Sequence, residues 1–407
     1  MNRANTPRDL LLRIVKEKHE LLPSIMKEKG IDCWIVFVRE TMAIEDPVMN
    51  LVVGGDVVWE SAFIFVNNED GTFSKTAIVG NFDADAEEEK GIWDKVTPYV
   101  EGISTPLHKY FESINPKNIA VNYSIDDIMS DGLTHGMYLK LCSMLSEKKE
   151  LFVSAEPIIR LLRGRKTKTE IELITKACEM AEEINKTVTA KLKPGMTETE
   201  IQAMYYEQMD QLGVIEAWQR ASCPAIDAGP DKNIGHVGPS PKHKTKKGHT
   251  LHNDFGVTLH GYCSDFQRMW FFGYEKDIPE ELQHAFDTVH KAITKAADYI
   301  RPGVTGESVD KIARSHVITR GYEEYGHGLG HQVGRKAHDG GVLLAPPWER
   351  YGDSPKGLVE ENNVFTLELH VKTKNYGAVS LEEDIVVTKT GCRFLVPRQE
   401  KFIIIES

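Results

Sequence analysis

The sequence predicts two domains of different class: an α/β domain in residues 1–160, and an α+β domain with an internal pseudo-duplication in residues 161–407. Three observations support this prediction. The chain has 407 residues, which is enough for two cores, because domains usually run to roughly 100–200 residues. Helical and strand patterns alternate in the first part, and a helix–turn–helix motif occurs twice in the second.

The elements of the first domain follow from the spacing of its apolar residues. Leucine and isoleucine recur with helical spacing over residues 7–30, and CWIVFV at residues 33–38 predicts a buried strand. Residues 61–80 predict two strands around the turn sequence NEDG, and NIAVNY at residues 118–123 predicts a further short strand. A domain boundary is expected at residues 155–160.

The second domain is predicted to open with a helix and then to repeat one motif. Thr169 is expected to cap this helix, whose apolar face begins at Ile171. The sequence KLKPGMTETEI is echoed by YIRPGVTGESV, so that Pro194 and Pro302 hold matching places 108 residues apart. Each copy predicts a helix, a Pro-Gly turn and a threonine-capped second helix, as in a duplicated domain.

Composition excludes several classes of protein. Hydrophobic residues make up 41% of the chain, and no stretch reaches the roughly 20 apolar residues of a membrane span, so we expect a soluble protein without a membrane partner. The formal net charge of -12 argues against a nucleic-acid partner. The N-terminal residues lack a signal-peptide pattern, and the six cysteines form no C-x-x-C pair, so a cytoplasmic location is expected.

One predicted hairpin brings two aspartates together. Residues 249–272 alternate as two antiparallel strands around a turn at His260 and Gly261, which places Asp254 and Asp265 on opposite strands. Aspartate is disfavoured in strands, and two carboxylates this close repel each other unless a cation lies between them. Metal binding is the favoured explanation, and two solvent-facing aspartates on an exposed sheet are the alternative.

A second predicted hairpin carries two glutamates. Glu368 and Glu382 lie seven residues on either side of Asn375, so they can face each other across the two strands. Along the first strand, Thr366, Glu368 and His370 share one face, and the opposite face is wholly apolar. Because such a strand should be central in its sheet, its polar face is expected to line a site.

The glycine-rich stretch YGHGLGHQVGRKAHDGG at residues 325–341 adds imidazoles to these carboxylates. Its three histidines are His327, His331 and His338. Four carboxylates and one imidazole suit two divalent ions such as Mn²⁺, Co²⁺, Fe²⁺ or Zn²⁺, and two ions about 3.5–4 Å apart can share a nucleophilic hydroxide. The set therefore predicts a hydrolase.

The order NDFG, SD, HGLGH, HD, TLE and LEED before VVT resembles the pita-bread metallopeptidases of family M24, in the prolidase and aminopeptidase P branch. The resemblance covers residues 161–390, and the first domain resembles the creatinase-type N-terminal domain of that branch. It implies five metal ligands in chain order: Asp254, Asp265, His331, Glu368 and Glu382. It also implies that His338 and His236 contact the substrate, and leaves His327 without a role.

The resemblance further implies a mechanism. Glu368 would accept the proton of the attacking water, while His338 and His236 would hydrogen-bond the oxyanion or the peptide group. Glu383 also lies in the last motif, but the ungapped match favours Glu382, and strand alternation turns Glu383 to the opposite face.

The sequence also departs from the family pattern. His252 stands where an apolar residue is usual, His370 stands in place of part of a Pro-Gly pair, and Ser380 replaces a common basic residue. By parity His252 shares a face with Asp254, and His370 with Glu368. The two histidines are interpreted as partners of the ligands, extra ligands or substrate contacts, or as histidines satisfied within the sheet.

The resemblance thus implies dinuclear metal-dependent hydrolysis of a peptide bond near the N-terminus of small peptides, with Xaa-Pro as the expected substrate. Mn²⁺ is the expected ion, with Co²⁺, Zn²⁺ or Fe²⁺ as the others, and a homodimer is the expected assembly. A metal-free creatinase-like amidinohydrolase and a non-catalytic binding protein on the same fold are the alternatives. Retention of all five ligand types argues against both.

Overall fold

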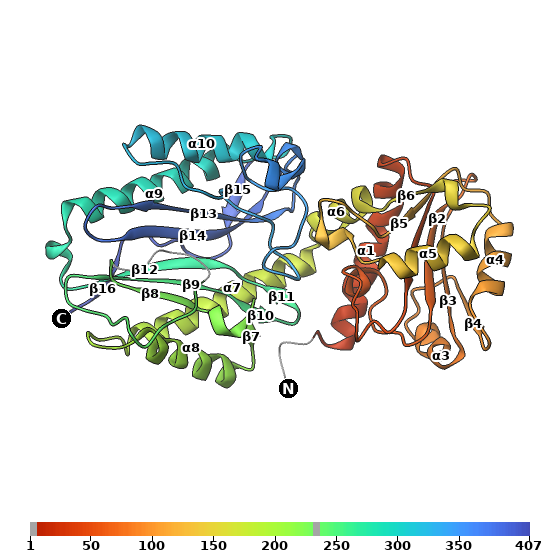
Figure 1. Cartoon of the computed structure of the whole chain (residues 1–407), viewed down its shortest axis with the longest axis horizontal. Coiled ribbons are helices and arrows are strands. Elements are labelled where there is room, and N and C mark those ends of the chain that lie inside the picture. Colours follow the sequence, from red (N-terminus) through yellow and green to blue (C-terminus); the bar gives the residue numbers. More distant parts are fainter. Residues whose placement is uncertain (1–5, 231–236) are drawn as a thin grey trace. The chain divides into compact units, whose positions relative to one another are not determined.

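The computed structural model describes residues 6–230 and 237–407 (Figure 1). It separates into two compact units, one of residues 7–163 and the other of residues 164–407 together with Thr6. Helix α6 (Glu156–Gly164) contains the observed division and overlaps the boundary expected at residues 155–160. Among the described residues, no helix combines the length and the apolar character that crossing a membrane requires.

The first unit is a six-stranded sheet between two helical layers, with the strand order β4-β3-β2-β1-β5-β6. Its strands are β1 (Cys33–Val38), β2 (Ser61–Asn67), β3 (Phe73–Gly80), β4 (Lys95–Tyr99), β5 (Ile119–Val121) and β6 (Phe152–Ser154). Its other helices are α1 (Arg8–Glu28), α2 (Met49–Val52), α3 (Asn81–Glu89), α4 (Ser104–Glu112) and α5 (His135–Met144). Helices α1 and α6 pack on one face of the sheet, and α4 and α5 pack on the other. The predicted α/β class of this unit is confirmed.

The second unit combines four long helices with three small sheets. Its helices are α7 (Lys168–Thr189), α8 (Glu198–Leu212), α9 (Glu280–Tyr299) and α10 (Gly306–Thr319). Its strands are β7 (Ile215–Glu216), β8 (Ala225–Ala228), β9 (Thr250–Phe255), β10 (Val257–Leu259), β11 (Tyr262–Cys263), β12 (Phe266–Phe272), β13 (Val364–Lys372), β14 (Ala378–Val387), β15 (Cys392–Phe394) and β16 (Ile403–Ile405).

These strands form a layer with helices on both sides (Figure 1). Four strands pair in the order β16-β12-β9-β8, three in the order β13-β14-β15, and three in the order β11-β10-β7. Strand β12 contacts β13 and β14, so the sheet β16-β12-β9-β8 and the sheet β13-β14-β15 meet at these strands. Helix α9 packs against β13 and β14, while α7 and α8 contact strands of the other sheets.

The internal duplication is visible at the two Pro-Gly turns. Gly195 and Gly303 have φ values of 93° and 91°, a left-handed conformation that favours glycine. Thr197 and Thr305 then cap α8 and α10 with their side chains, as predicted. Each of these threonines also forms an isolated antiparallel bridge, Thr197 with Lys244 and Thr305 with Leu358.

The predicted cap of helix α7 is wrong by two residues. Thr167, not Thr169, accepts the backbone N–H of Glu170, and the Glu170 side chain accepts the backbone N–H of Thr167. This reciprocal pair satisfies the backbone N–H groups of Thr167 and Glu170 at the start of the helix. Thr169 therefore lies within the helix and does not cap it.

Candidate metal centre

The first hairpin positions two aspartates at the meeting point of the sheets. Its turn has His260 at φ 51° and Gly261 at φ 76°, both left-handed, as a tight two-residue hairpin requires. Asp254 lies on β9 with Gln267 of β12 as its direct partner. Asp265 immediately precedes β12. The two aspartates therefore lie on either side of the turn, as predicted, but Gln267 rather than Asp265 stands opposite Asp254.

The second hairpin places two glutamates side by side. Glu368 of β13 and Glu382 of β14 are direct partners in the ladder, as their spacing predicted. Glu383 points to the opposite face, where its carboxylate lies 3.2 Å from the Arg268 guanidinium and accepts the backbone N–H of Gln399. Strand alternation thus separates two adjacent glutamates into two environments.

The glycine-rich segment brings His331 to the second hairpin. The backbone N–H of Thr366 donates to the His331 carbonyl at 3.0 Å, and that of Glu368 donates to the Leu329 carbonyl at 2.7 Å. A Cβ on Gly330 would lie 2.0 Å from the Thr366 carbonyl oxygen, so only glycine allows the segment to run this close to β13.

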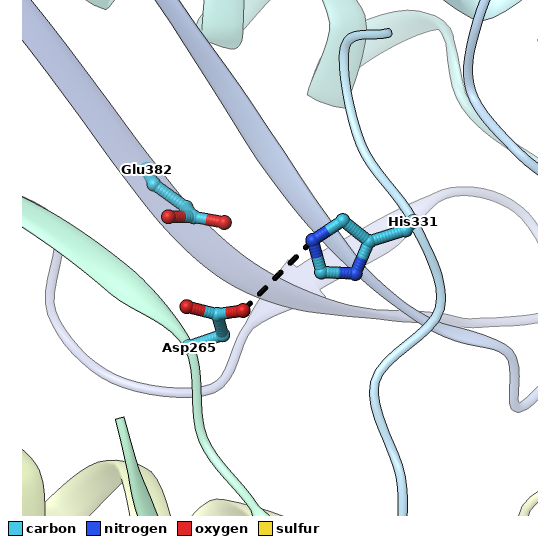
Figure 2. Close-up of side chains that lie close together, drawn as sticks. All are labelled: Asp265, His331 and Glu382. Atoms are coloured by element: carbon cyan, nitrogen blue, oxygen red, sulfur yellow. Dashed lines mark ion pairs between the residues drawn. The ribbon is translucent and has the colours of Figure 1, made fainter. Parts of the chain in front are cut away.

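The side chains of these elements converge (Figure 2). His331 Nε2 lies 3.8 Å from Asp265 Oδ2 and 3.6 Å from Glu368 Oε1. Asp265, His331 and Glu382 each offer one ligand atom, and these atoms all lie within 4.8 Å of one another. The structure therefore brings together Asp265, His331, Glu368 and Glu382, which are four of the five ligands predicted from the sequence and come from four separate segments.

Burial and mutual repulsion dominate the electrostatics of the cluster. Burial raises the pKa of the Asp265 and Glu382 carboxyls well above their usual range, and the charges of neighbouring carboxylates raise it further. Burial, followed by the charge of Asp254, raises the pKa of Glu368 to about 8. Burial lowers the pKa of His331 to about 3, so its imidazole is neutral and keeps a lone pair for a metal.

This donor set fits divalent cations. Carboxylate oxygens with a neutral imidazole are the ligands that Mn²⁺, Co²⁺, Fe²⁺ and Zn²⁺ accept. The carboxylates disfavour one another's ionised forms, and a cation among them would relieve that repulsion. The residues present therefore suit a metal centre.

Two polar residues of the cluster were not predicted. The Gln267 amide donates to Glu382 Oε2 at 2.9 Å and to Glu368 Oε2 at 3.4 Å. Asp384 Oδ2 accepts the backbone N–H of Asp265 at 3.0 Å, and burial raises the pKa of Asp384 to about 7. Parity was the available signal, because Asp384 follows Glu382 by two residues and Gln267 faces Asp254.

Of the predicted substrate contacts, one can be placed. The ring of His338 meets that of His331 edge-on, with 4.1 Å between centroids. His236 lies outside the described residues.

The remaining histidines of the second unit that the sequence singled out also have hydrogen-bond partners. His370 Nδ1 lies 3.1 Å from His327 Nε2, and burial lowers the pKa of His370 to about 4. His252 hydrogen-bonds Asp227 and Gln267, both at 2.9 Å. Burial acts to lower the pKa of His252, but the hydrogen bond and charge of Asp227 outweigh it and the pKa is raised. The hydrogen bond to His370 gives His327 a partner that the sequence did not predict.

A cavity of about 450 Å³ opens on this cluster. It is lined by Ala217, Trp218, Gln219, Ser222, Ala225, Asp254, Asp265, Lys336, Ala337 and His338. A larger cavity of about 780 Å³ in the same unit contains none of the five candidate ligands. Of these two cavities among the described residues, the smaller is therefore the one that borders the cluster, at Asp254 and Asp265.

Comparison with known proteins agrees with this geometry. The profile of metallopeptidase family M24 matches residues 172–389, which include all five candidate ligands. An Xaa-Pro dipeptidase of Pyrococcus horikoshii is 27% identical over 287 residues, 69% of this chain and 76% of that protein. An Xaa-Pro dipeptidase of Pyrococcus furiosus is 27% identical over 321 residues, 76% of this chain and 87% of that protein.

Solved structures extend the likeness to both units. The X-Pro aminopeptidase from Thermotoga maritima superposes with a TM-score of 0.72 at 23% identity, covering 96% of this chain and 100% of that chain. The Xaa-Pro dipeptidase from Bacillus anthracis superposes with a TM-score of 0.73 at 21% identity, covering 96% and 99%. The predicted two-domain, pita-bread fold class is confirmed.

Proposed function

The chain belongs to metallopeptidase family M24, and from that premise we propose that it hydrolyses Xaa-Pro bonds near the N-terminus of small peptides at a centre of two divalent ions. The observation that carries the proposal is the convergence of His331 with Asp265, Glu368 and Glu382, of which Asp265 also lines a cavity. Its relatives among the Xaa-Pro dipeptidases support the choice of substrate.

The ions would be held by Asp254, Asp265, His331, Glu368 and Glu382. When bound, they supply Lewis acidity and lower the pKa of water to near neutrality. Mn²⁺ is our proposal for the ion, because carboxylates outnumber imidazoles four to one in this set. Co²⁺, Zn²⁺ and Fe²⁺ also accept such donors.

The chain's own residues would handle the proton and the substrate. Glu368 lies beside the cluster, with Oε1 3.6 Å from His331 Nε2, so its carboxylate is placed to accept the proton of the attacking water. His338 lies on the cavity wall, where its ring can hydrogen-bond the peptide group. Lys336 on the same wall offers an ammonium to a peptide's C-terminal carboxylate, which favours short substrates. His236 is proposed as a second substrate contact.

The wider setting is proposed on the resemblance to the prolidase and aminopeptidase P branch. We propose a cytoplasmic homodimer with a small peptide as its partner molecule. The boundary near residue 160 would separate a creatinase-type N-terminal domain from the catalytic domain.

The proposal is tested by measuring bound metal and then offering a panel of Xaa-Pro and Xaa-Ala dipeptides and tripeptides with Mn²⁺, Co²⁺ or Zn²⁺. We expect cleavage of Xaa-Pro substrates by the wild type and none by Glu382→Ala. A wild type that binds no divalent ion and cleaves no peptide contradicts the proposal. Turnover of creatine without metal would instead identify the amidinohydrolase alternative.

A further inference from the structure

Two departures from the family pattern meet at one buried side chain. His252 and Ser380 lie on strands of different sheets, and both hydrogen-bond the amide of Gln267 on β12. All three residues are buried, with 5% or less of their surface exposed. They therefore form one network, which we call the Gln267 network.

The two ends of the Gln267 amide face different kinds of group. Its Oε1 lies 2.5 Å from the Ser380 hydroxyl and 2.9 Å from His252 Nε2. Its Nε2 donates to Glu382 Oε2 at 2.9 Å and to Glu368 Oε2 at 3.4 Å. Rotating the amide by 180° would set its carbonyl oxygen against two carboxylates, so the chemistry of the neighbours fixes its orientation.

His252 and Ser380, which hydrogen-bond the amide oxygen, each have a further partner. His252 Nδ1 lies 2.9 Å from Asp227 Oδ2, which fixes the ring. The Ser380 hydroxyl also lies 3.2 Å from the Leu369 carbonyl oxygen. Ser380 pairs directly with His370 in the β13–β14 ladder. This pair lies between the Glu368–Glu382 pair and the turn of the hairpin.

The network also separates the two oxygens of Glu368. Oε2 faces Gln267, whereas Oε1 lies 3.6 Å from His331 Nε2, on the side where the other candidate ligands gather. A carboxylate held in this way presents one oxygen to a cation and keeps the other for its protein partner.

We propose that Gln267, oriented by Ser380 and His252, is a positioning residue that holds the carboxylates of Glu368 and Glu382 at the metal centre. The proposal rests on the ligand set given under the proposed function. It also accounts for His252 and Ser380, since both hydrogen-bond the same amide oxygen. Partners of this kind typically change metal affinity by 10–100-fold when they are removed.

The test replaces the amide by a side chain of similar length that cannot donate a hydrogen bond. Gln267→Met is compared with Gln399→Met, because Gln399 is a second buried amide, 6% exposed against 5% for Gln267. Gln399 bonds the Met269 and Lys401 backbone and contacts none of the five candidate ligands among its hydrogen bonds. Both variants lose the contacts of a buried amide, but only Gln267→Met loses those to the glutamates.

Mn²⁺ and Co²⁺ affinities of the metal-free full chain are measured by calorimetry, the visible absorption of the Co²⁺-loaded protein is recorded, and thermal unfolding is followed. We expect Gln267→Met to weaken metal binding about 10–100-fold and to shift the Co²⁺ absorption. Gln399→Met should lower the unfolding temperature and keep the wild-type affinity and spectrum. Equal metal affinity and spectra in Gln267→Met and the wild type overturn the proposal.

Ser380→Ala provides a second test of the proposal if Gln267→Met does not fold. It leaves the amide in place but removes the shorter of the two hydrogen bonds to Oε1, and we expect a smaller loss of metal affinity in the same direction. Unchanged affinity in a folded Ser380→Ala contradicts the proposal. A wild type that binds metal but cleaves no peptide would refute the proposed function and leave these comparisons valid.

Discussion

The hairpins β2–β3 and β13–β14 have the same construction and opposite chemistry. In β2, Phe63 and Phe65 enter the core on one face of the sheet and Ile64 enters the core on the other, so both faces are apolar. In β13, Leu367 enters an apolar core beneath α9, whereas Glu368 on the other face joins a group of carboxylates. Both hairpins are antiparallel and regular in register.

The difference shows which interactions stabilise each hairpin. The first is stabilised by apolar burial on both faces, at about 25 cal/mol per Å² of apolar surface. The second has that contribution on one face only, and on the other it brings together carboxylates that repel one another without a cation. We therefore expect changes in the first hairpin to affect stability alone, and changes on the acidic face of the second to affect metal binding and hydrolysis.

The largest effect is expected from a matched pair of neighbours in β14. Glu382→Gln removes a candidate ligand and should reduce metal affinity and hydrolysis by more than the roughly 100-fold that loss of an outer partner can cost. Glu383→Gln breaks the pair with Arg268 and should cost up to a few kcal/mol of stability, with near-normal metal affinity. Metal titration and thermal unfolding of both variants check this. Equal loss of metal affinity in both would break the contrast between the two faces.

A core truncation in the first hairpin should give the opposite result. Phe65→Ala removes a fully buried ring that stacks on Trp34 with 5.2 Å between centroids, and should cost about 3–5 kcal/mol. Metal affinity of the folded protein should stay at the wild-type value. Chemical denaturation with metal titration measures both quantities, and a large loss of affinity would show that the comparison between hairpins is too simple.

A smaller effect is expected from pH at the same core. His19 Nε2 lies 2.8 Å from the Val52 carbonyl oxygen, and burial lowers the pKa of His19 from 6.5 to about 4. Because the folded pKa is the lower one, the stability contributed is fully present above pH 6.5 and is lost as the pH falls toward 4, by up to about 3 kcal/mol.

His19→Gln isolates this contribution. Asp46 of the same unit has a pKa raised to about 6 by burial, which gives the opposite dependence, but it is present in both proteins and cancels in their difference. Denaturation curves of wild type and variant at pH 7 and pH 4.5 should differ more at pH 7. A constant difference would show that His19 titrates normally.

Strand alternation made much of the candidate site predictable. It turned Glu383 away from Glu382 and put His252 on the face of Asp254, because the side-chain period of a strand is fixed. The equal spacing of Glu368 and Glu382 about Asn375 predicted that these two residues pair. The glycines around His331 allow a close backbone approach, which Gly330 makes against Thr366.

The missed features depend on contacts that local sequence does not encode. Gln267 carries no charge, and its role depends on contacts that form only where strands of two separate sheets meet. The sequence predicts a cap at Thr169, whereas in the structure the reciprocal hydrogen bonds of Thr167 and Glu170 decide where α7 begins. Asp384 contacts Asp265 from a segment 119 residues away.

The most direct test of the central claim is a titration of the metal-free full chain with Mn²⁺ while cleavage of an Xaa-Pro dipeptide is followed. We expect no hydrolysis without metal, and a rate that rises with occupancy of the cluster up to two ions per chain. Hydrolysis at full rate in the presence of a chelator, or metal binding that leaves the peptide intact at every occupancy, would contradict the account.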